Sequence, residues 1–427
     1  MIRGILQIMM DGLPFSKNVF SHFWKISSAS YAVLTLIFFL GKNILWSQDQ
    51  AKGQVVDYAH YNQGIAFKNL GKYTDAILSF EKFIQQYPHE HPDVYYQRGK
   101  SYLLLHQFDR AVLDFQQVIQ LDQVNQEASY HLGKIFFQQQ KYNEALRYFT
   151  QSIQLNTSHA LSYNDRGLVL CQLRKFDRAL ADFSTATKLD PTFAVAFNNA
   201  GAARYFKQDI AKPTSKDLKE AKGWFSKAIQ IDPTLAVAYR NRASISILTK
   251  NYKLALDDLE KAKKINPNDA MTFFYLGVAY ADTYQAQRAF DTFKKVLEMN
   301  PQLAIAHEEM GNLYKLTQQF DYAIYQYELA KSARPNTGNL YKGLLSYRTA
   351  LVYAAQKNTP KMYAHLKKAR VLGAFKDQQL YQDFQKAKEL NPFRLEKSFR
   401  RFQKSLFKIK KDNKFLNADL GWFRMRK

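Results

Sequence analysis

The sequence is poor in the residues that support disulfide, redox or zinc chemistry. Its 427 residues include a single cysteine, Cys171. One thiol cannot form an internal disulfide, and the sequence has no Cys-x-x-Cys pair for zinc binding or redox exchange. We interpret Cys171 as a small packing residue within a helical segment, and a reactive thiol is the alternative.

Signatures of catalysis are also missing. The sequence contains no Gly-x-Ser-x-Gly elbow, no glycine-rich phosphate loop and no His-Glu-x-x-His helix. The tripeptide His89-Glu90-His91 offers two imidazoles and a carboxylate, but adjacent loop positions point in different directions. We therefore predict a protein that is not an enzyme, with no cofactor and no metal. An enzyme that uses an unrecognised site is the alternative.

Acidic residues are scarce relative to basic ones. The chain has 61 Lys and Arg against 37 Asp and Glu, a formal net charge of +24. Such a surface favours anionic partners, such as lipid headgroups, acidic proteins or nucleic acid, and nucleic acid is the least favoured of these. An ordinary solvated surface is the alternative. We expect acidic pairs such as Asp257-Asp258 to form a solvated helix face.

Long apolar runs are almost absent, with one exception near the start of the chain. Residues 31–40 are apolar, and the stretch 27–46 is long enough to span a bilayer. Basic residues before it favour a cytoplasmic N-terminus with the rest of the chain translocated. We predict that 1–56 is a signal or anchor segment with a linker, which places the protein at the cell envelope with its remainder on the non-cytoplasmic side. A cleaved signal peptide and a helix docked on the neighbouring domain are the alternatives.

The sequence does contain one pattern of about 34 residues, repeated eight times. Each unit has two stretches in which apolar residues recur at spacings of three and four, which predicts two amphipathic helices. A small residue marks the first stretch: Gly64, Gly99, Gly133, Gly167, Gly201, Ala243, Gly277 and Gly311. An alanine marks the second: Ala76, Ala111, Ala145, Ala179, Ala221, Ala255, Ala289 and Ala323. Four residues later come Phe80, Phe115, Phe149, Phe183, Phe225, Leu259, Phe293 and Tyr327.

A proline closes six of the eight units, and it separates each helical hairpin from the next because it cannot continue a helix interior. These are Pro88, Pro191, Pro233, Pro267, Pro301 and Pro335. The period and the small, aromatic and proline positions resemble the tetratricopeptide repeat. The resemblance implies an all-α, right-handed solenoid of about eight helix-turn-helix repeats, in which each hairpin packs against its neighbours. We assign the repeats to residues 57–338.

The fifth unit is longer than the others, with extra residues at about 207–220. In this stretch Pro213 is followed by Thr214 and Asp217, an order that predicts a break and then a capped helix start. We expect the insertion to be a loop at one edge of the solenoid.

The pattern weakens after the eighth unit. A solenoid end exposes an apolar face, so an atypical unit is expected to cover it. We predict that residues 339–405 are a degenerate repeat and helical cap and that 406–427 form a basic tail. The expected helices of the cap are 340–356, 360–372 (stopped by Gly373), 377–389 and 395–407.

The resemblance implies that the first helices line a concave groove and that the residues one to three positions before each small residue have roles there, with Lys100 and Lys134 adding positive charge beside the tyrosines. Amides and aromatics recur there, and a ladder of amides suits the backbone of an extended peptide. The predicted groove residues are Tyr61, Asn62, Tyr96, Gln97, Lys100, Tyr130, His131, Lys134, Asn164, Asp165, Asn198, Asn199, Arg240 and Asn241. The lysine/asparagine clamp by which some members bind chaperone tails is not reproduced, because Tyr61 and Ile65 occupy its first positions.

We therefore predict a scaffold or adaptor that binds a protein or peptide segment in the groove. The alternative is a basic surface and tail that bind an anionic polymer or lipid surface. Asn199 and Asn241 should matter most for a peptide, and we expect their replacement to leave thermal stability nearly unchanged, since both lie away from the contacts of Gly201 and Ala243.

Overall fold

The structure is a computed structural model that describes residues 56–207, 214–333 and 338–411. The predicted membrane segment 27–46 and most of the predicted tail 406–427 lie outside these residues. The chain forms two compact units, 1–117 and 118–427, whose boundary falls inside one helix. Within the described residues there is no strand, and no helix combines the length and the apolarity needed to cross a bilayer.

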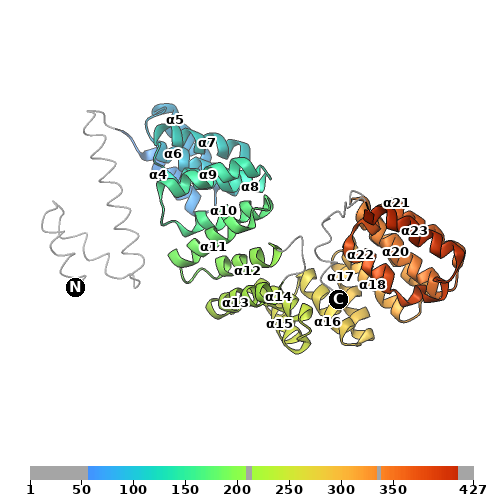
Figure 1. Ribbon diagram of the computed structural model, residues 1–427. Coiled ribbons are helices and arrows are strands. Elements are labelled where there is room, and N and C mark those ends of the chain that lie inside the picture. The colour runs from blue at the N-terminus through green and yellow to red at the C-terminus, as the bar shows by residue number, and fades with distance from the viewer. Residues whose placement is uncertain (1–55, 208–213, 334–337, 412–427) are drawn as a thin grey trace. The chain divides into compact units, whose positions relative to one another are not determined.

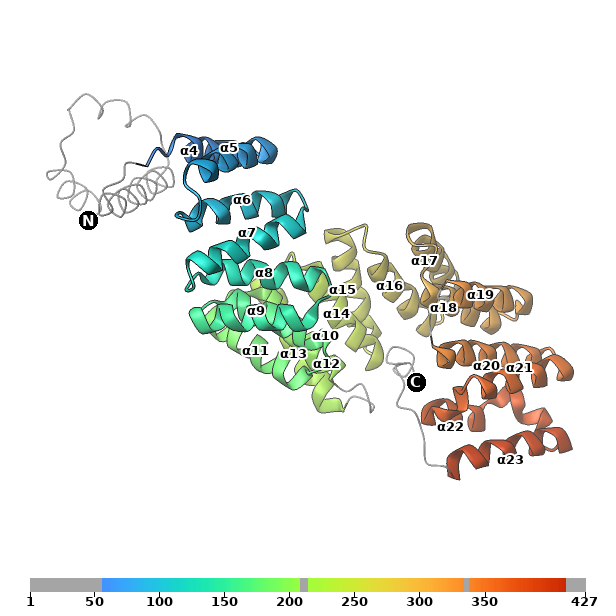
Figure 2. The same cartoon turned by 90° about the horizontal axis from the view of Figure 1, so that it is seen from above.

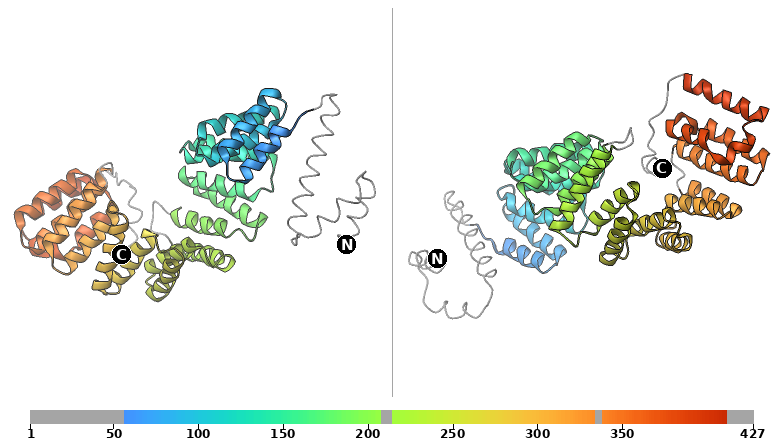
Figure 3. Two further views of the ribbon diagram at one scale, coloured as in Figure 1. Left: turned by 180° about the vertical axis from the view of Figure 1, so that it is seen from behind. Right: turned by 60° about the horizontal axis from the view of Figure 1, so that its bottom comes forward.

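Eight helical hairpins follow one another, as the repeat pattern predicts (Figure 1). The first unit holds α4 (Ala59–Asn69), α5 (Tyr73–Gln86), α6 (Pro92–Leu104) and the start of α7 (Phe108–Leu121). The second unit continues with α8 (Gln126–Gln138), α9 (Tyr142–Leu155), α10 (Ala160–Gln172), α11 (Phe176–Leu189), α12 (Ala194–Phe206), α13 (Ser215–Ile231), α14 (Ala236–Leu248), α15 (Tyr252–Ile265), α16 (Ala270–Asp282), α17 (Ala286–Met299), α18 (Ala304–Leu316) and α19 (Phe320–Ser332). The pairing is visible from two further sides in Figure 3. The predicted solenoid of helix-turn-helix repeats is confirmed.

The small residues of the pattern allow each pair of helices to approach closely. A Cβ atom on Gly277 would lie 2.6 Å from the ring of Phe293, closer than non-bonded carbon atoms can approach. The sixth hairpin has alanine at this position, Ala243, and there the facing residue is Leu259 instead of an aromatic ring. Both of these side chains are fully buried. The size of one residue therefore sets the size of its partner.

Seven of the eight hairpins turn through one residue in the left-handed conformation. These residues are Gly71, His106, Gln140, Arg174, Lys250, Tyr284 and Gln318, all with φ between 56° and 73°. The turn returns hydrogen bonds to the end of the first helix, as when Gln140 N–H donates to Phe137 O at 3.0 Å and Lys141 N–H to Phe136 O at 2.8 Å. Glycine, the usual signal for this conformation, occurs at only one of these turns. The sequence therefore did not predict them.

The long fifth hairpin begins its second helix with the predicted cap. The Thr214 side chain accepts a hydrogen bond from Asp217 N–H, and the Asp217 carboxylate accepts one from Thr214 N–H, which is a complete capping box. The predicted capped helix start is confirmed, and it makes α13 17 residues long, so the expected loop does not extend to residue 220.

The C-terminal cap consists of α20 (Asn339–Ala355), α21 (Thr359–Val371), α22 (Gln378–Lys386) and α23 (Lys397–Lys411), with short 3₁₀ turns η2 (Ala374–Lys376) and η3 (Lys388–Phe393). Figure 2 shows α20 and α21, then α22, then α23 in successive layers. One core runs from the eighth hairpin into the cap and includes Tyr327, Phe375, Phe384, Phe399 and Phe402.

Two helices of the cap have bounds that differ from the prediction by more than one residue. The helix expected over 377–389 ends at Lys386, because Ala387 adopts an extended conformation (φ −61°, ψ 116°) and Pro392 lies in the 3₁₀ turn that follows. The last helix begins and ends later than 395–407. Gly373, predicted to stop α21, has φ 81°.

Candidate functional site

The first helices of successive hairpins contact one another. In the second unit these contacts join α8, α10, α12, α14, α16 and α18, and in the first unit they join α4 and α6. Side chains from neighbouring repeats therefore meet along one face of each unit, which we call the first-helix surface. The predicted groove residues lie on these helices.

Four asparagines of the second unit form hydrogen bonds between neighbouring first helices. Asn199 Nδ2 donates to Asn164 Oδ1, and Asn241 Nδ2 donates to Asn198 Oδ1, both at 2.9 Å. The acceptors are 4% and 5% exposed, whereas the donors are half-buried. The expectation that Asn199 and Asn241 have no structural role is therefore wrong, because each one links two hairpins. A buried amide that loses its partner destabilises the fold.

A second link joins α8 to α10 at the start of the row. The Tyr130 hydroxyl donates to Asp165 Oδ2 at 2.9 Å, and Asn164 Nδ2 donates to Asp165 Oδ1 at 2.8 Å. Burial raises the pKa of Tyr130, so the phenol stays protonated and remains a donor. Two side chains lie near the Tyr130 ring. The ring centre of His131 lies 5.8 Å from that of Tyr130, and the Lys134 ammonium lies 5.6 Å from the Tyr130 ring centre. Lys134 itself is exposed.

Arg240 is held by a carboxylate of the following repeat. Its Nη1 atom lies 2.5 Å from Asp269 Oδ2, and the Thr272 hydroxyl donates to the same oxygen at 2.6 Å. Burial opposes ionisation of Asp269, but the Thr272 hydrogen bond and the Arg240 charge outweigh it and lower the pKa of this carboxyl. Arg240 is therefore a fixed, partly exposed cation beside Asn241.

The first unit has corresponding links between α4 and α6. The Tyr61 hydroxyl donates to Asp93, which also accepts a hydrogen bond from Gln97 Nε2 at 3.2 Å. The Lys68 ammonium donates to Gln97, and burial lowers the pKa of Lys68. Lys100 Nζ lies 5.3 Å from the ring centre of Tyr96. Asn62 is half-buried on α4.

Sequence reasoning missed three buried ion pairs inside hairpins. Each joins an arginine of the first helix to an aspartate sixteen residues later through two hydrogen bonds of 2.6–2.9 Å: Arg98–Asp114, Arg166–Asp182 and Arg242–Asp258. The expectation of a solvated face is wrong for Asp258, which is 1% exposed. Its hydrogen bonds raise the pKa of Arg242. The signal was present, because each arginine directly precedes the small residue of its unit and each aspartate directly precedes Phe115, Phe183 or Leu259.

A further charged cluster joins the eighth hairpin to the cap. Arg348 Nη2 lies 2.8 Å from Glu308 Oε1, and its Nη1 donates to Asn312 Oδ1 at 2.6 Å. The hydroxyl of Tyr327 donates to the same asparagine oxygen at 2.8 Å, and that of Tyr341 donates to Glu308 at 3.3 Å. Glu308 is fully buried. This cluster fixes α20 on α18, which makes it structural.

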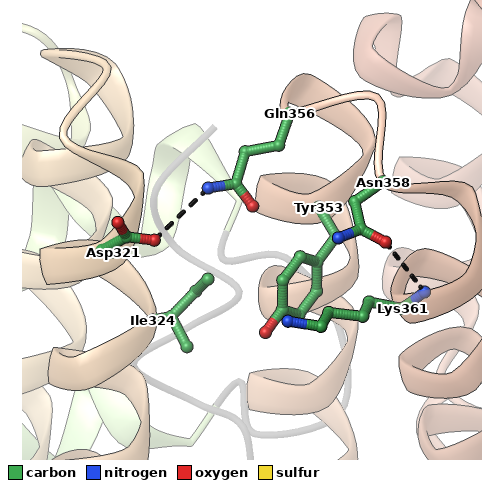
Figure 4. Close-up of a pocket in the computed structure, with 6 residues that line it drawn as sticks. All are labelled: Asp321, Ile324, Tyr353, Gln356, Asn358 and Lys361. Atoms are coloured by element: carbon green, nitrogen blue, oxygen red, sulfur yellow. Dashed lines mark hydrogen bonds between the residues drawn. The ribbon is translucent and has the colours of Figure 1, made fainter.

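An open pocket of about 580 Å³ lies between α19 and the cap (Figure 4). Asp321 and Ile324 of α19 face Tyr353, Gln356, Asn358 and Lys361 of the cap, and Gln356 Nε2 donates to Asp321 at 3.4 Å. Small-molecule sites are usually enclosed and mostly apolar. This pocket is neither, so the candidate site remains the first-helix surface.

His91 and Cys171 take part in packing, whereas His89 is exposed. The ring of His91 lies 5.3 Å from that of Phe83, whereas His89 Nδ1 lies 3.1 Å from Gln117 Nε2, so the two imidazoles have different surroundings. In the described parts of the chain no three His, Cys, Asp or Glu residues are grouped to hold a metal ion. Burial raises the pKa of the Cys171 thiol to about 11, which keeps it protonated.

Two family models match the chain within the repeats. The model described as "Anaphase-promoting complex, cyclosome, subunit 3" matches residues 69–152, and the model described as "Tetratricopeptide repeat" matches residues 236–269. The chain is a tetratricopeptide-repeat protein. Tetratricopeptide repeats generally act as non-enzymatic scaffolds that mediate protein–protein interaction.

Solved structures similar to this tetratricopeptide-repeat protein include a tetratricopeptide repeat protein from Parabacteroides merdae, with 17% identity, a TM-score of 0.47 and coverage of 60% of this chain and 97% of that one. MamA has 24% identity, a TM-score of 0.37 and coverage of 40% and 96%. YrrB, described as a TPR protein with an unusual peptide-binding site, has 26% identity, a TM-score of 0.35 and coverage of 44% and 93%. None of the curated proteins compared with the sequence matches it.

Proposed function

We propose that this tetratricopeptide-repeat protein is a non-enzymatic scaffold or adaptor that binds an extended protein segment on its first-helix surface. The observation that carries the proposal is the row of side chains held by neighbouring repeats, from Tyr130 and Asp165 to Asn199 and Asn241. Groups held in one position before binding lose little conformational entropy when a ligand arrives.

The amides of this row retain capacity for a ligand. A side-chain amide has two N–H donors and an oxygen that accepts two hydrogen bonds, whereas the inter-repeat bond of Asn241 uses one donor. An extended peptide presents donors and acceptors at regular intervals. The exposed Lys134 adds positive charge at one end of the row, which favours a segment with acidic side chains, whereas the charge of Arg240 is balanced by Asp269.

Photo-crosslinking tests this site without removing its hydrogen bonds. A photoreactive residue replaces Lys100 or Lys134 on first helices and, as matched controls, the exposed Lys188 or Lys227 on second helices. We expect one partner to crosslink from positions 100 and 134 and not from the controls. A partner captured equally from all four positions, or only from the second helices, would contradict the proposal.

We also propose that the protein acts at the cell envelope, with its repeats on the non-cytoplasmic side. The support is the apolar stretch 27–46 and the basic residues Arg3, Lys17 and Lys25 before it. Cell fractionation with added protease tests the location. The protease should digest the repeats once the outermost layer of the cell envelope is permeabilised, while the cytoplasm stays closed. A mature chain that starts near Asp49 would indicate a cleaved signal peptide, and a full-length cytoplasmic product would contradict the location.

A further inference from the structure

The positive charge of the chain is concentrated in the cap. Residues 339–411 contain 18 Lys and Arg against 4 Asp and Glu, whereas the eight repeats, 57–338, contain 34 against 29. Per residue, the cap therefore carries a far larger net charge than the repeats. A field of this kind attracts an anionic surface and loses strength as salt is added.

Three of the four acidic groups of the cap bind other groups within the protein. Asp377 is buried and accepts a hydrogen bond from Leu380 N–H at 2.9 Å. Glu389 forms an ion pair with Lys315 at 2.7 Å, and Glu396 accepts the Tyr363 hydroxyl at 3.0 Å. The exposed basic side chains are Lys357, Lys361, Lys367, Lys368, Lys376, Lys386, Lys388, Lys397, Arg400 and Arg401.

Helix α23 separates its apolar and basic residues onto two faces. Phe399, Phe402 and Leu406 are buried in the cap core. Lys397, Arg400 and Arg401, at spacings of three and four, are exposed. Because packing has already covered the apolar face, the basic face is what α23 offers to a partner. The sequence continues the same spacing with lysines at 404, 408 and 411.

Two aliphatic side chains stand exposed among these basic residues. Leu395, two residues before Lys397, is 80% exposed, and Val371, next to Arg370, is 79% exposed. Exposed aliphatic groups beside lysine and arginine suit the boundary between lipid headgroups and acyl chains. Single-stranded nucleic acid instead requires aromatic side chains for base stacking, and from Tyr341 to Phe402 no aromatic side chain of the cap is exposed.

We propose that the cap binds an anionic lipid bilayer through the exposed face of α23 and the basic residues around it. Leu395 inserts at the headgroup level while Lys397, Arg400 and Arg401 contact lipid phosphates. This surface lies on different elements from the first-helix row of α8 to α14. It can therefore hold the protein at a membrane while the repeats bind a protein segment.

Vesicle binding by the full chain tests the proposal. The readout is the ratio of binding to phosphatidylcholine vesicles with and without phosphatidylserine, in which any contribution of the N-terminal segment to neutral lipid cancels. The test variant carries Lys397→Gln, Arg400→Gln and Arg401→Gln. The matched control carries Lys216→Gln, Lys219→Gln and Lys227→Gln, which removes the same charge from exposed positions on α13. Circular dichroism confirms that both variants are folded.

Each basic side chain near an anionic surface strengthens binding roughly fivefold, so the cap variant should lose about 100-fold. The control should stay within about twofold, and Leu395→Ser should weaken binding several-fold with no change of charge. Equal losses in the two charge variants, or no loss in the cap variant, would overturn the proposal. A third pair of results would also overturn it: duplex DNA displaces the chain from vesicles, and Leu395→Ser leaves vesicle binding unchanged. The surface would then prefer a nucleic acid.

Discussion

In seven hairpins a glycine of the first helix faces an aromatic ring of the second, and the sixth has Ala243 opposite Leu259. The contact leaves no room for a Cβ atom on Gly277 while Phe293 is present. Because the interior is close-packed, one methyl group on one helix must be matched by a smaller side chain on the other.

We expect Gly277→Ala to destabilise the protein by about 1–3 kcal/mol, because the new methyl group clashes with Phe293. Adding Phe293→Leu reproduces the pair found in the sixth hairpin and should recover part of that loss. Urea unfolding of the two single variants and the double variant measures the coupling. If the two effects simply add, the steric explanation fails.

Single positions of this kind are what the sequence predicts well, because the spacing of small and aromatic residues follows directly from helix geometry. The burial of Asp258 was not predicted, since it depends on Arg242 in another helix. Neighbouring Asp257 is exposed, so the charge of the pair alone does not distinguish them. Only the recurrence of arginine and aspartate sixteen residues apart in three units carried that information.

Removing Asp258 should leave the Arg242 charge half-buried without its carboxylate. We expect Asp258→Ala to destabilise the fold by about 3–5 kcal/mol, as for other buried ion pairs from which one partner is deleted. Asp257→Ala is the matched control and should change stability by less than about 0.5 kcal/mol. If the two variants lower the free energy of unfolding equally in chemical denaturation, the Arg242–Asp258 ion pair does not stabilise the fold.

At the scale of helices and turns, local chemistry decides where each element begins and ends. The cap of α13 was predictable because Thr214 and Asp217 have the spacing of a capping box. The left-handed turn residues were not, because Tyr284 and Arg174 take a conformation that their side chains disfavour. Packing of the two helices imposes that conformation, and the residue types in the turn do not predict it.

The cap of α13 should depend on pH. The Thr214 hydrogen bonds lower the pKa of Asp217 below its usual value, so the native state favours the ionised carboxyl. The stabilisation is present above the unfolded-state pKa, about 4, and is lost as the pH falls through the lower folded-state value. We expect Thr214→Ala to destabilise by about 1 kcal/mol at neutral pH and by less in acid. A loss that is the same at both pH values would contradict this origin.

At the scale of the whole chain, stability comes from contacts between neighbouring repeats. The Asn164–Asn199 and Asn198–Asn241 bonds and the Arg348–Glu308 pair all join successive hairpins. The order of the repeats was predictable from their period. The asparagine bonds were not, because they depend on how far one first helix lies from the next, and a pattern within one repeat does not contain that distance.

We expect Asn199→Ala combined with Asn241→Ala to lower the free energy of unfolding by about 1–3 kcal/mol, since two buried acceptors lose their donors. The control is Gln154→Ala at an exposed position of α9, which should have almost no effect. Thermal and urea unfolding measure both. An unchanged unfolding midpoint in the double variant would show that these asparagines do not stabilise the fold and serve only to contact a ligand.

The sixth hairpin also constrains the order in which its two substitutions arose. If Ala243 and Leu259 descend from a glycine and a phenylalanine, as in the neighbouring units, the two changes are not interchangeable as first steps. Leucine first leaves a small void that the surrounding helices can partly close. If alanine replaces glycine first, its methyl group overlaps the ring of the phenylalanine that is still present on the second helix. A lineage could pass through the leucine intermediate with a folded protein, so position 259 should have changed before position 243.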